Sequence, residues 1–254
     1  MNTLGGNVCI RNGLELDYPW QYAVKSLLPI CDRVVISDCD STDGTWELVQ
    51  QWAQHEPKIV LHRYAWTDPK GSNTWWPDWL NIARQHLPTD MHIQLDADEI
   101  LHEDSYEEVL KARDNQSILY CTRFNFWRDP QHLIPEGFCC GRTVLRIAPT
   151  NRPIPSDYPY PPAEETMGLG QQSTVKIMHY GFLREHNAFF RKARAVQRIW
   201  ANSYDPRLES AESKGKDWAS DPALCGGWNL KLDEYHGTHP AIIIPWLKDR
   251  GYNA

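Results

Sequence analysis

The chain has 254 residues, a formal net charge of −7 and seven cysteines. This length is sufficient for one large α/β domain whose core needs neither disulfides nor a metal to fold. The acidic charge argues against broad nucleic-acid binding, which depends on Lys and Arg neutralising phosphates. Because the cysteines are odd in number and no pair has C-x-x-C spacing, we expect reduced thiols in a cytoplasmic protein.

No segment of the sequence predicts targeting or membrane insertion. Residues 1–6 contain neither a basic region nor an apolar one. The longest later apolar run, residues 241–247, is seven residues long and contains Pro245, so it is too short to span a bilayer. We therefore expect no signal peptide and no transmembrane helix.

The first hundred residues predict strands and helices in alternation. Short apolar runs bounded by turn residues predict strands at 7–10, 33–37, 58–64 and 92–95. Apolar residues at helical spacing predict helices at 17–28, with Asp17 as N-cap, at about 46–53 and at 76–87. This alternation is typical of a parallel sheet covered by helices on both faces.

The pattern is less regular after Glu99. Helices are predicted from about residue 104 to 113 and from 187 to about 203, and strands at 117–126, 143–147 and 175–179. Residues 149–162 are rich in proline, which excludes regular structure and leaves an active-site loop or a linker as the two interpretations. We expect one compact unit.

Acidic residues gather where two of the predicted strands end. Asp38 follows the second strand, and Asp96, Asp98 and Glu99 follow the fourth. The carboxyl ends of parallel strands share one edge, where open α/β sheets bind ligands. Side chains two residues apart on an extended segment point the same way, so Asp96 and Asp98 can reach one divalent cation. The alternative is that both cap the following helix and face water.

Three segments resemble the signatures of family-2-like glycosyltransferases of GT-A fold. They are VVISDCDSTDGT at residues 34–45, LDADE at 95–99 and HYGFLR at 179–184, and the likeness covers about residues 7–200. It implies an α/β fold with a GT-A-type, mostly parallel sheet flanked by helices. About residues 1–100 would form a Rossmann-like half that binds a nucleotide sugar, and about residues 101–254 an irregular half that binds an acceptor.

The same resemblance implies a metal-dependent enzyme that moves a hexose from a UDP-linked donor to a hydroxyl group. The acceptor would be a glycan, a lipid-linked sugar or a protein. Residues at positions that hold the nucleoside in this family are Ile10, Arg11, Asn12 and Asp38. Many relatives have two adjacent acids at the last position, where this chain has Asp38 followed by Cys39, so the base is less defined than the use of metal.

Residues matching the family's metal site come from two of the three segments. Asp98 and His179 would bind Mn²⁺ or Mg²⁺ between the two phosphates, and Asp96 would contact the ribose or a metal-bound water. Arg184 would add positive charge beside the leaving nucleoside diphosphate. These assignments predict a site that stabilises the charge growing on the leaving group.

We expect an inverting transfer, and such a transfer also needs a base for the acceptor hydroxyl. Glu164 and Glu165 follow the proline-rich segment, where related sequences often carry their catalytic acid, and Glu165 is favoured over Glu164. The competing interpretation of this pair is a solvated loop. Glu99 is the rival base, although its simplest interpretation is a cap of the next helix.

Other functions remain open. A nucleotidyltransferase would share the nucleotide-binding half, but it usually carries a glycine-rich basic loop where residues 11–15 have one glycine and an acid. A non-catalytic nucleotide-sugar-binding module would have lost metal ligands, and none is evidently lost. A glycosyltransferase acting on hydroxylated bases in DNA, or on a phosphorylated glycan, would use a basic face. Candidates for that face are Arg184, Arg191, Lys192, Arg194, Arg198 and Arg207, which otherwise form a solvated surface.

Overall fold

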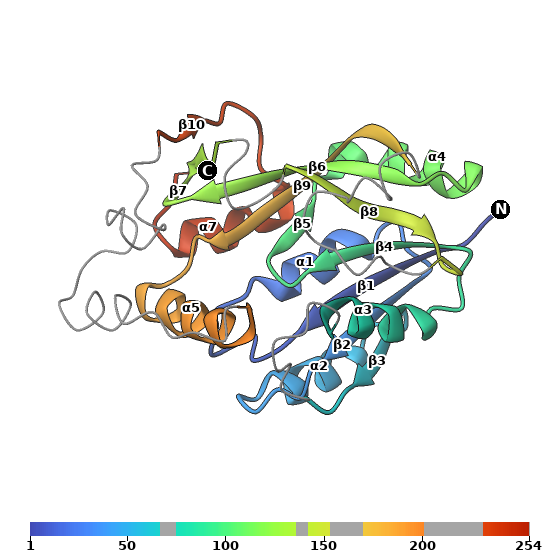
Figure 1. Cartoon of the computed structure of the whole chain (residues 1–254), viewed down its shortest axis with the longest axis horizontal. Coiled ribbons are helices and arrows are strands. Elements are labelled where there is room, and N and C mark those ends of the chain that lie inside the picture. Colours follow the sequence, from blue (N-terminus) through green and yellow to red (C-terminus); the bar gives the residue numbers. More distant parts are fainter. Residues whose placement is uncertain (67–74, 136–141, 153–169, 201–230, 254) are drawn as a thin grey trace.

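The computed structural model describes residues 1–66, 75–135, 142–152, 170–200 and 231–253, without the side chains of 75–79, 186 and 196–200. The strands in these ranges form one ten-stranded mixed sheet. Its main path runs in the order β10-β7-β6-β8-β4-β1-β2-β3, and β9 pairs with β5 and β6 beside that path. The sheet therefore includes strands from both halves of the chain (Figure 1).

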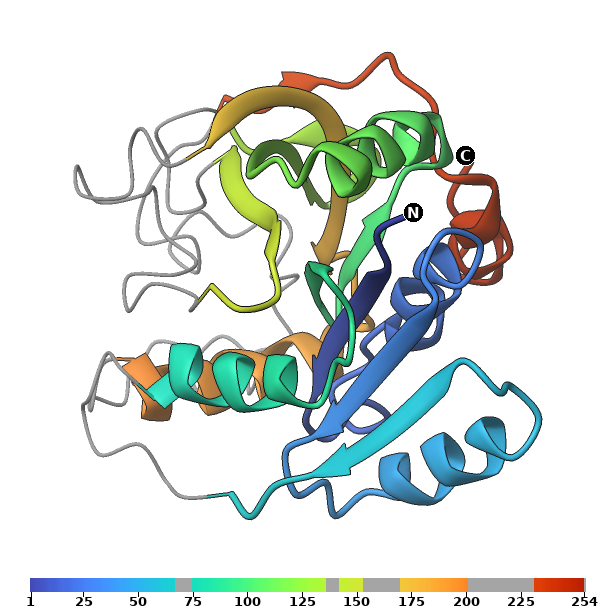
Figure 2. The ribbon, with the colours of Figure 1, turned by 90° about the vertical axis from the view of Figure 1, so that its right-hand side faces the viewer.

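Four parallel strands make up the first half of the sheet. They are β1 (Leu4–Ile10), β2 (Arg33–Asp38), β3 (Ile59–Arg63) and β4 (Met91–Asp96). The helices between them are α1 (Trp20–Leu27), α2 (Thr45–Ala53) and α3 (Trp75–Gln85). Figure 2 shows α1 and α2 on one face of the sheet and α3 on the other. The topology confirms the predicted α/β class with a Rossmann-like first half.

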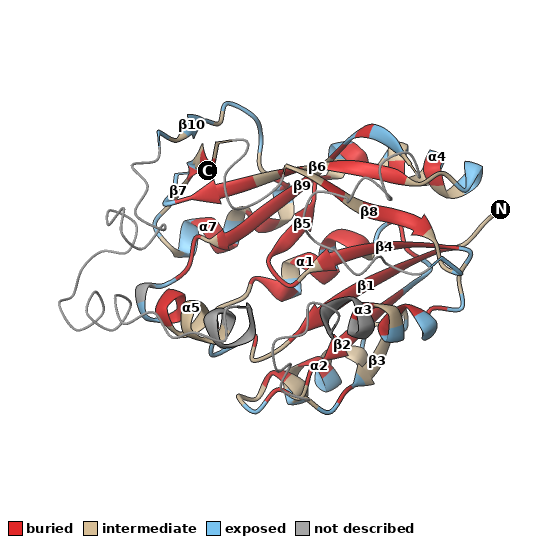
Figure 3. Cartoon of the chain, in the orientation of Figure 1, coloured by how far each residue is buried: buried red, intermediate tan, exposed pale blue. Residues whose placement is uncertain are grey.

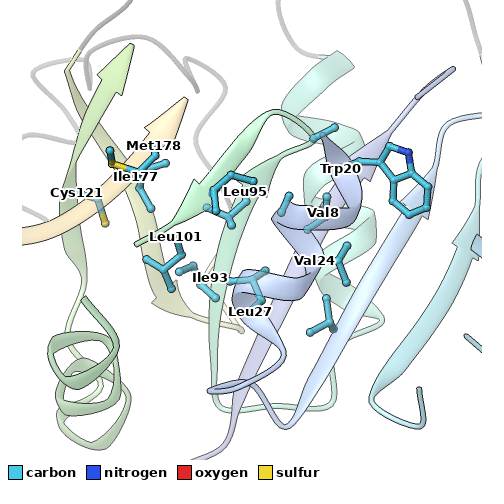
Figure 4. Close-up of a cluster of buried hydrophobic side chains, with 14 of the residues drawn as sticks. Val8, Trp20, Val24, Leu27, Ile93, Leu95, Leu101, Cys121, Ile177 and Met178 are labelled. Atoms are coloured by element: carbon cyan, nitrogen blue, oxygen red, sulfur yellow. The ribbon is translucent and has the colours of Figure 1, made fainter. Parts of the chain in front are cut away.

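Part of the core lies between this sheet and α1. All seven residues of β1 are buried, because helices cover the strand on both faces (Figure 3). Val24 and Leu27 of α1 lie among Val8, Ile93 and Leu101 (Figure 4). Their helical spacing gives α1 one apolar face, so burial of that face fixes the helix against the strands that carry the predicted acids.

Strands of the second half extend the same sheet. They are β5 (Glu99–Leu101), β6 (Leu119–Trp127), β7 (Asp129–Leu133), β8 (Thr143–Pro149), β9 (Gln171–Phe182) and β10 (Asp233–Glu234). β8 pairs antiparallel with β4 and with β6, so it joins the two halves. β9 pairs antiparallel with β5, which sets His179 opposite Glu99.

The helices of the second half are α4 (Tyr106–Asn115), α5 (His186–Trp200) and α7 (Ile244–Asp249), with 3-10 turns η1 (Glu103–Ser105) and η3 (Ala241–Ile243). The predicted helices and strands of this half are present with shifted ends. The apolar run at 241–247, predicted only to be too short for a membrane span, forms η3 and the start of α7, and it buries Trp246 and Leu247 in the core.

One predicted helix start is wrong. Asp17 does not cap α1, which begins at Trp20 after Pro19. Asp17 has a positive φ of 50° and its carboxylate accepts from Arg250 instead. Four cysteines within the described ranges, Cys9, Cys31, Cys39 and Cys121, are free thiols, as predicted.

The helices that the structure describes include none long and apolar enough to cross a membrane.

Candidate active site

The predicted acids lie at one edge of the sheet. Asp38 ends β2, Asp96 ends β4, and Asp98 lies in the turn that leads into β5. β1 runs between β2 and β4, with Ile10 paired to Asp38 and Cys9 to Asp96. Asp38 and Asp96 are therefore two strand spacings apart, about 10 Å. In Figure 1 the carboxyl ends of these strands point toward α5.

The loops after β1 and β2 are tied together by hydrogen bonds. The Asn12 amide donates to Oγ of Ser41 at 2.9 Å, and the Thr42 amide donates to Oδ1 of Asn12 at 2.9 Å. Arg11 donates to the carbonyl of Cys39 at 2.7 Å. The positive φ of Asn12, 48°, is a conformation that asparagine tolerates better than most residues. The predicted nucleoside-side residues thus belong to one rigid pair of loops.

Asp38 is fully buried in this pair of loops. Its Oδ2 accepts from the amide of Ser41 at 3.0 Å and lies 3.3 Å from Nε of Arg63. Its Oδ1 is buried and has no hydrogen-bond partner among the described residues. A buried acceptor without a partner costs about 1–3 kcal/mol, so Asp38 is suited to accept from a ligand N–H.

Arg11 and Ile10 differ in the part of the residue that a ligand could contact. The Arg11 guanidinium stacks 3.7 Å from the centre of the Trp66 ring, which gives the edge a flat cationic surface. The Ile10 side chain packs in the core, and its carbonyl accepts from the Cys39 amide at 2.7 Å. Any contact of Ile10 with a ligand would therefore involve the backbone.

Asp98 is held by two cationic side chains, which we call the edge clamp (Asp98, Arg184 and Lys192). Its Oδ2 accepts from Nη2 of Arg184 at 2.7 Å and from Nζ of Lys192 at 2.8 Å. Its Oδ1 lies 3.5 Å from Nε2 of His179. Burial alone would raise the pKa of Asp98, but Lys192, His179 and Arg184 outweigh burial and hold that pKa well below its usual range.

Gly181 is required where the chain passes this clamp. A Cβ there would lie 2.5 Å from Nε2 of His179 and 2.6 Å from Oδ2 of Asp98, so any larger residue would push the two groups apart. Arg184 is fixed from the same turn: its Nε donates to the Gly181 carbonyl at 2.7 Å, and its Nη1 donates to the carbonyl of Leu16. Its guanidinium also lies 4.0 Å from the centre of the Tyr18 ring.

Glu99 is held in a second cluster, the interior clamp (Glu99, Arg123 and Arg146). Its Oε1 lies 2.5 Å from Nη2 of Arg146 and 3.2 Å from Nη1 of Arg123, and its Oε2 accepts from the Asp96 amide at 3.0 Å. Burial would raise the pKa of Glu99, but the two arginines outweigh burial and lower it.

The interpretation of Glu99 as a helix cap is wrong, because His102 precedes η1 and Ser105 precedes α4 at the cap positions. Both oxygens of Glu99 are also engaged, which disfavours its assignment as the rival base.

Asp96 lies between the two clamps. Its Oδ2 accepts from Arg146 at 3.1 Å, and its Oδ1 is buried without a hydrogen-bond partner among the described residues. Burial and the neighbouring Glu99 raise the pKa of Asp96 to about 6, against the opposing effect of Arg146. Asp96 and Asp98 therefore face different cations, although the sequence predicts that both reach one metal ion.

The predicted metal ligands do not fit a divalent ion in this arrangement. No three His, Cys, Asp or Glu side chains in the described ranges group as a ligand set. Mg²⁺ binds a carboxylate oxygen at about 2.1 Å, and at Oδ2 of Asp98 that space is taken by Arg184 and Lys192. A metal at Oδ2 of Asp98 would require both cations to move.

Three cationic residues of the two clamps, Lys192, Arg123 and Arg146, were not predicted to lie in the site. Lys192 was predicted to lie on a basic helix face, yet it reaches Asp98. Arg123 and the fully buried Arg146 are charged residues inside mostly apolar strands. That position is the available sequence signal for a buried ion pair. Glu164 and Glu165, the predicted bases, lie outside the described residues.

Comparison with known proteins yields distant structural similarity alone. No protein-family model and no curated protein matches the chain. It is similar to S. aureus TarS 1-349 in complex with UDP-GlcNAc, with 13% identity, a TM-score of 0.47, and coverage of 87% of this chain and 74% of that one. In the structure of S. aureus TarS, with 12% identity and a TM-score of 0.46, the match covers 87% of this chain and 44% of that one.

A putative glucose-1-phosphate thymidylyltransferase from Bacillus anthracis, in complex with sucrose, is also similar. Its identity is 11% and its TM-score 0.45, over 82% of this chain and 99% of that one. At identities this low and TM-scores below 0.5, these likenesses carry no argument about activity. Any functional assignment therefore rests on the residues themselves.

Proposed function

We propose that the protein transfers a sugar from a nucleotide sugar to a hydroxyl acceptor. The observation that carries the proposal is the joint presence, on one sheet edge, of a buried unpaired acceptor and a cationic clamp. Oδ1 of Asp38 has no partner among the described residues, and Asp98 carries two cations. A nucleoside diphosphate combines N–H donors at one end with negative charge at the other, so it matches this arrangement.

Each part of the donor has a proposed partner. The base would donate to Asp38 and lie near the guanidinium of Arg11, and Asn12 would order the loop around it. Asp96 would accept from the ribose, and Arg184 would face the diphosphate. A UDP-linked hexose is the proposed donor, in keeping with the resemblance of residues 34–45 and 95–99 to family-2-like glycosyltransferases.

The reaction proposed is an inverting transfer. The rate of such a transfer depends on neutralising the negative charge that develops on the leaving diphosphate. It also depends on a base that takes the proton of the acceptor hydroxyl. Glu165, or failing that Glu164, stays the predicted base. Metal dependence, with Asp98 and His179 as ligands, also stays a prediction from the sequence, and no step is derived from it because the clamp holds Asp98.

The test is nucleoside diphosphate release from UDP-, GDP- and dTDP-sugars, with EDTA and with Mn²⁺, alongside calorimetry of the matching nucleotide. We expect release from one donor class. Asp38→Asn should weaken nucleotide binding by about tenfold or more, because an amide nitrogen replaces an acceptor oxygen. Asp40→Asn is the matched control, since Asp40 lies on the same loop with 47% of its side chain exposed.

Three outcomes would contradict the proposal. Binding without turnover of any donor would indicate a non-catalytic module, and release of pyrophosphate from a nucleoside triphosphate and a sugar phosphate would indicate a nucleotidyltransferase. Failure of every nucleotide to bind would refute a nucleotide-sugar site altogether.

A further inference from the structure

Arg84, in the last turn of α3, is a buried cation with 7% of its surface exposed. Its Nε donates to Oδ1 of Asn81 at 3.3 Å, and no carboxylate in the described part of the chain forms an ion pair with it. Asn81 lies one turn earlier, so the side chain reaches back from the carbonyl groups at the end of α3, which could otherwise offset its charge. Burial lowers the pKa of Arg84. A charge removed from water and left unpaired is costly, so this position favours an anion.

The helix that carries Arg84 covers the face of the sheet opposite α1 (Figure 2). Ala83 belongs to the apolar cluster that includes Cys9 of β1. Further along, a Cβ at Gly5 would lie 2.7 Å from a methyl carbon of Leu87. Arg84 lies between Ala83 and Leu87 in the chain, so its turn passes over the middle of β1, between Cys9 and Gly5.

Three polar side chains on this face of the sheet lack partners. Val8 and Ile93 belong to the core beside α1, so Asn7, His92 and Gln94 point to the opposite face, toward α3. Asn7 pairs with Gln94 across β1 and β4, and all three side chains come from residues at most 1% exposed. Both amide atoms of Asn7, Nδ1 of His92 and Oε1 of Gln94 are buried without a hydrogen-bond partner in the ranges that the structure describes.

The charge of Arg84 acts on this polar group. Burial and Arg84 together lower the pKa of His92 to about 3, so its imidazole is neutral at pH 7. A neutral imidazole donates from one nitrogen and accepts at the other. Arg84 and Asn7 supply N–H donors, and Asn7 and Gln94 supply acceptor oxygens. A matching ligand therefore carries negative charge and at least one hydroxyl group.

We propose that Asn7, Arg84, His92 and Gln94 bind hydrogen phosphate between α3 and the sheet. The charged oxygens of phosphate would accept from Arg84 and from the amide of Asn7, and its hydroxyl would donate to Oε1 of Gln94. Sulfate has nearly the same shape but carries no proton at pH 7, so it would leave that acceptor unpaired. This site does not depend on nucleotide-sugar transfer at the sheet edge.

The experiment is calorimetric titration of inorganic phosphate into the full chain at pH 7, at constant ionic strength in chloride. Sulfate and glycerol 3-phosphate are titrated separately. Wild-type protein is compared with Arg84→Met and Asn7→Ala. Arg33→Met is the matched control, because Arg33 is exposed on β2 and donates from Nη1 to the carbonyl of Pro57 at 2.7 Å. Thermal unfolding of each protein, with and without phosphate, is the second measurement.

We expect one phosphate to bind per chain. Arg84→Met should weaken phosphate binding by about 10- to 100-fold, the effect of losing a charged hydrogen bond, and Asn7→Ala by about 3- to 10-fold. Arg33→Met should behave as wild type. Glycerol 3-phosphate should bind more weakly than phosphate, because a monoester has a second pKa of about 6 and has mostly lost that proton at pH 7.

Thermal unfolding should respond to the same contacts. Each tenfold increase in free phosphate above the dissociation constant should raise the wild-type melting temperature by about 3–5 °C. Arg84→Met should lose this response. Without phosphate, Arg84→Met should melt at a higher temperature than wild type, because the substitution removes an unpaired buried charge.

Several results would overturn the phosphate site. They are the absence of saturable phosphate binding, equal affinity for phosphate in wild type and Arg84→Met, and binding of sulfate or glycerol 3-phosphate as tight as that of phosphate. A lower melting temperature of Arg84→Met without phosphate, or its failure to fold, would also overturn the site, since Arg84 would then stabilise the end of α3. None of these results bears on nucleotide-sugar transfer.

Discussion

Asp98 and Glu99 are neighbours in the chain, and each is held by two cationic side chains, yet the two clamps differ in burial. All three members of the interior clamp are buried, with Glu99 fully so. In the edge clamp, Lys192 keeps 18% of its side chain exposed at the carboxyl edge of the sheet. The same pairing chemistry therefore occurs in a fully enclosed cluster and in a cluster with one partly exposed member.

This difference separates a stabilising role from a binding role. A complete buried ion pair adds little net stability, but removing one partner leaves a charge without compensation in the interior. A pair that is partly exposed is screened by water, so losing it affects stability much less. The interior clamp should thus determine whether the protein folds, and the edge clamp should determine what it binds.

The largest expected effect on stability is that of substituting Glu99 in the interior clamp. Glu99→Gln should lower the free energy of unfolding by about 3–5 kcal/mol, because Arg123 and Arg146 lose the charge that compensates them in the interior. Urea denaturation measures the change. Glu107→Gln, which breaks an exposed pair with Lys111, is the control and should change stability by less than about 0.5 kcal/mol. Equal losses of stability in Glu99→Gln and Glu107→Gln would contradict a stabilising role for the interior clamp.

A smaller effect, a gain in stability at neutral pH, is expected from substituting Asp96. Burial and Glu99 raise its pKa from 3.8 to about 6, so the folded state binds this proton more tightly than the unfolded chain does. The contribution of Asp96 to stability is therefore most favourable below pH about 4 and falls as the pH rises to about 6. Asp96→Asn should exceed wild type in stability at pH 7 by up to about 3 kcal/mol.

Urea denaturation of wild type and Asp96→Asn across this pH range provides the measurement. The two proteins should converge as the pH falls below 3.8, because the carboxyl is then protonated in both states. Because Asp96 and Glu99 interact, the difference reports the titration of this pair of carboxyl groups. A difference that does not change with pH would contradict the assignment.

The smallest expected effect is on stability at Lys192. Lys192→Met should change the free energy of unfolding by less than about 1 kcal/mol, because the ammonium is partly solvated and Arg184 still compensates Asp98. The same urea experiment detects it. A loss as large as that of Glu99→Gln would make the edge clamp a structural element too.

Local sequence patterns predicted the framework and the acids of the site. The β-branched run of β2 and the apolar face of α1 are local signals, and so is the position of Asp38 and Asp96 at strand ends. The cations could not be predicted in this way. Arg146 is 47 residues from Glu99 and Lys192 is 94 residues from Asp98, so only the tertiary fold brings each pair together.

Two other misses have local causes. The three-residue strand β5 is too short to show a period, and its pairing with β9 defines it. Asp17 has the composition of an N-cap, but its left-handed backbone and its pairing with Arg250 place it outside the helix.

The bond that breaks in the donor tests the central claim most directly. Turnover of the selected nucleotide sugar in ¹⁸O-labelled water, without an acceptor, followed by mass spectrometry, shows which product carries the label. Attack at the anomeric carbon, as in sugar transfer, predicts ¹⁸O in the free sugar and none in the nucleoside diphosphate. Label in a phosphate group, or no turnover of any donor above that of the Asp98→Asn protein, would contradict nucleotide-sugar transfer at this sheet edge.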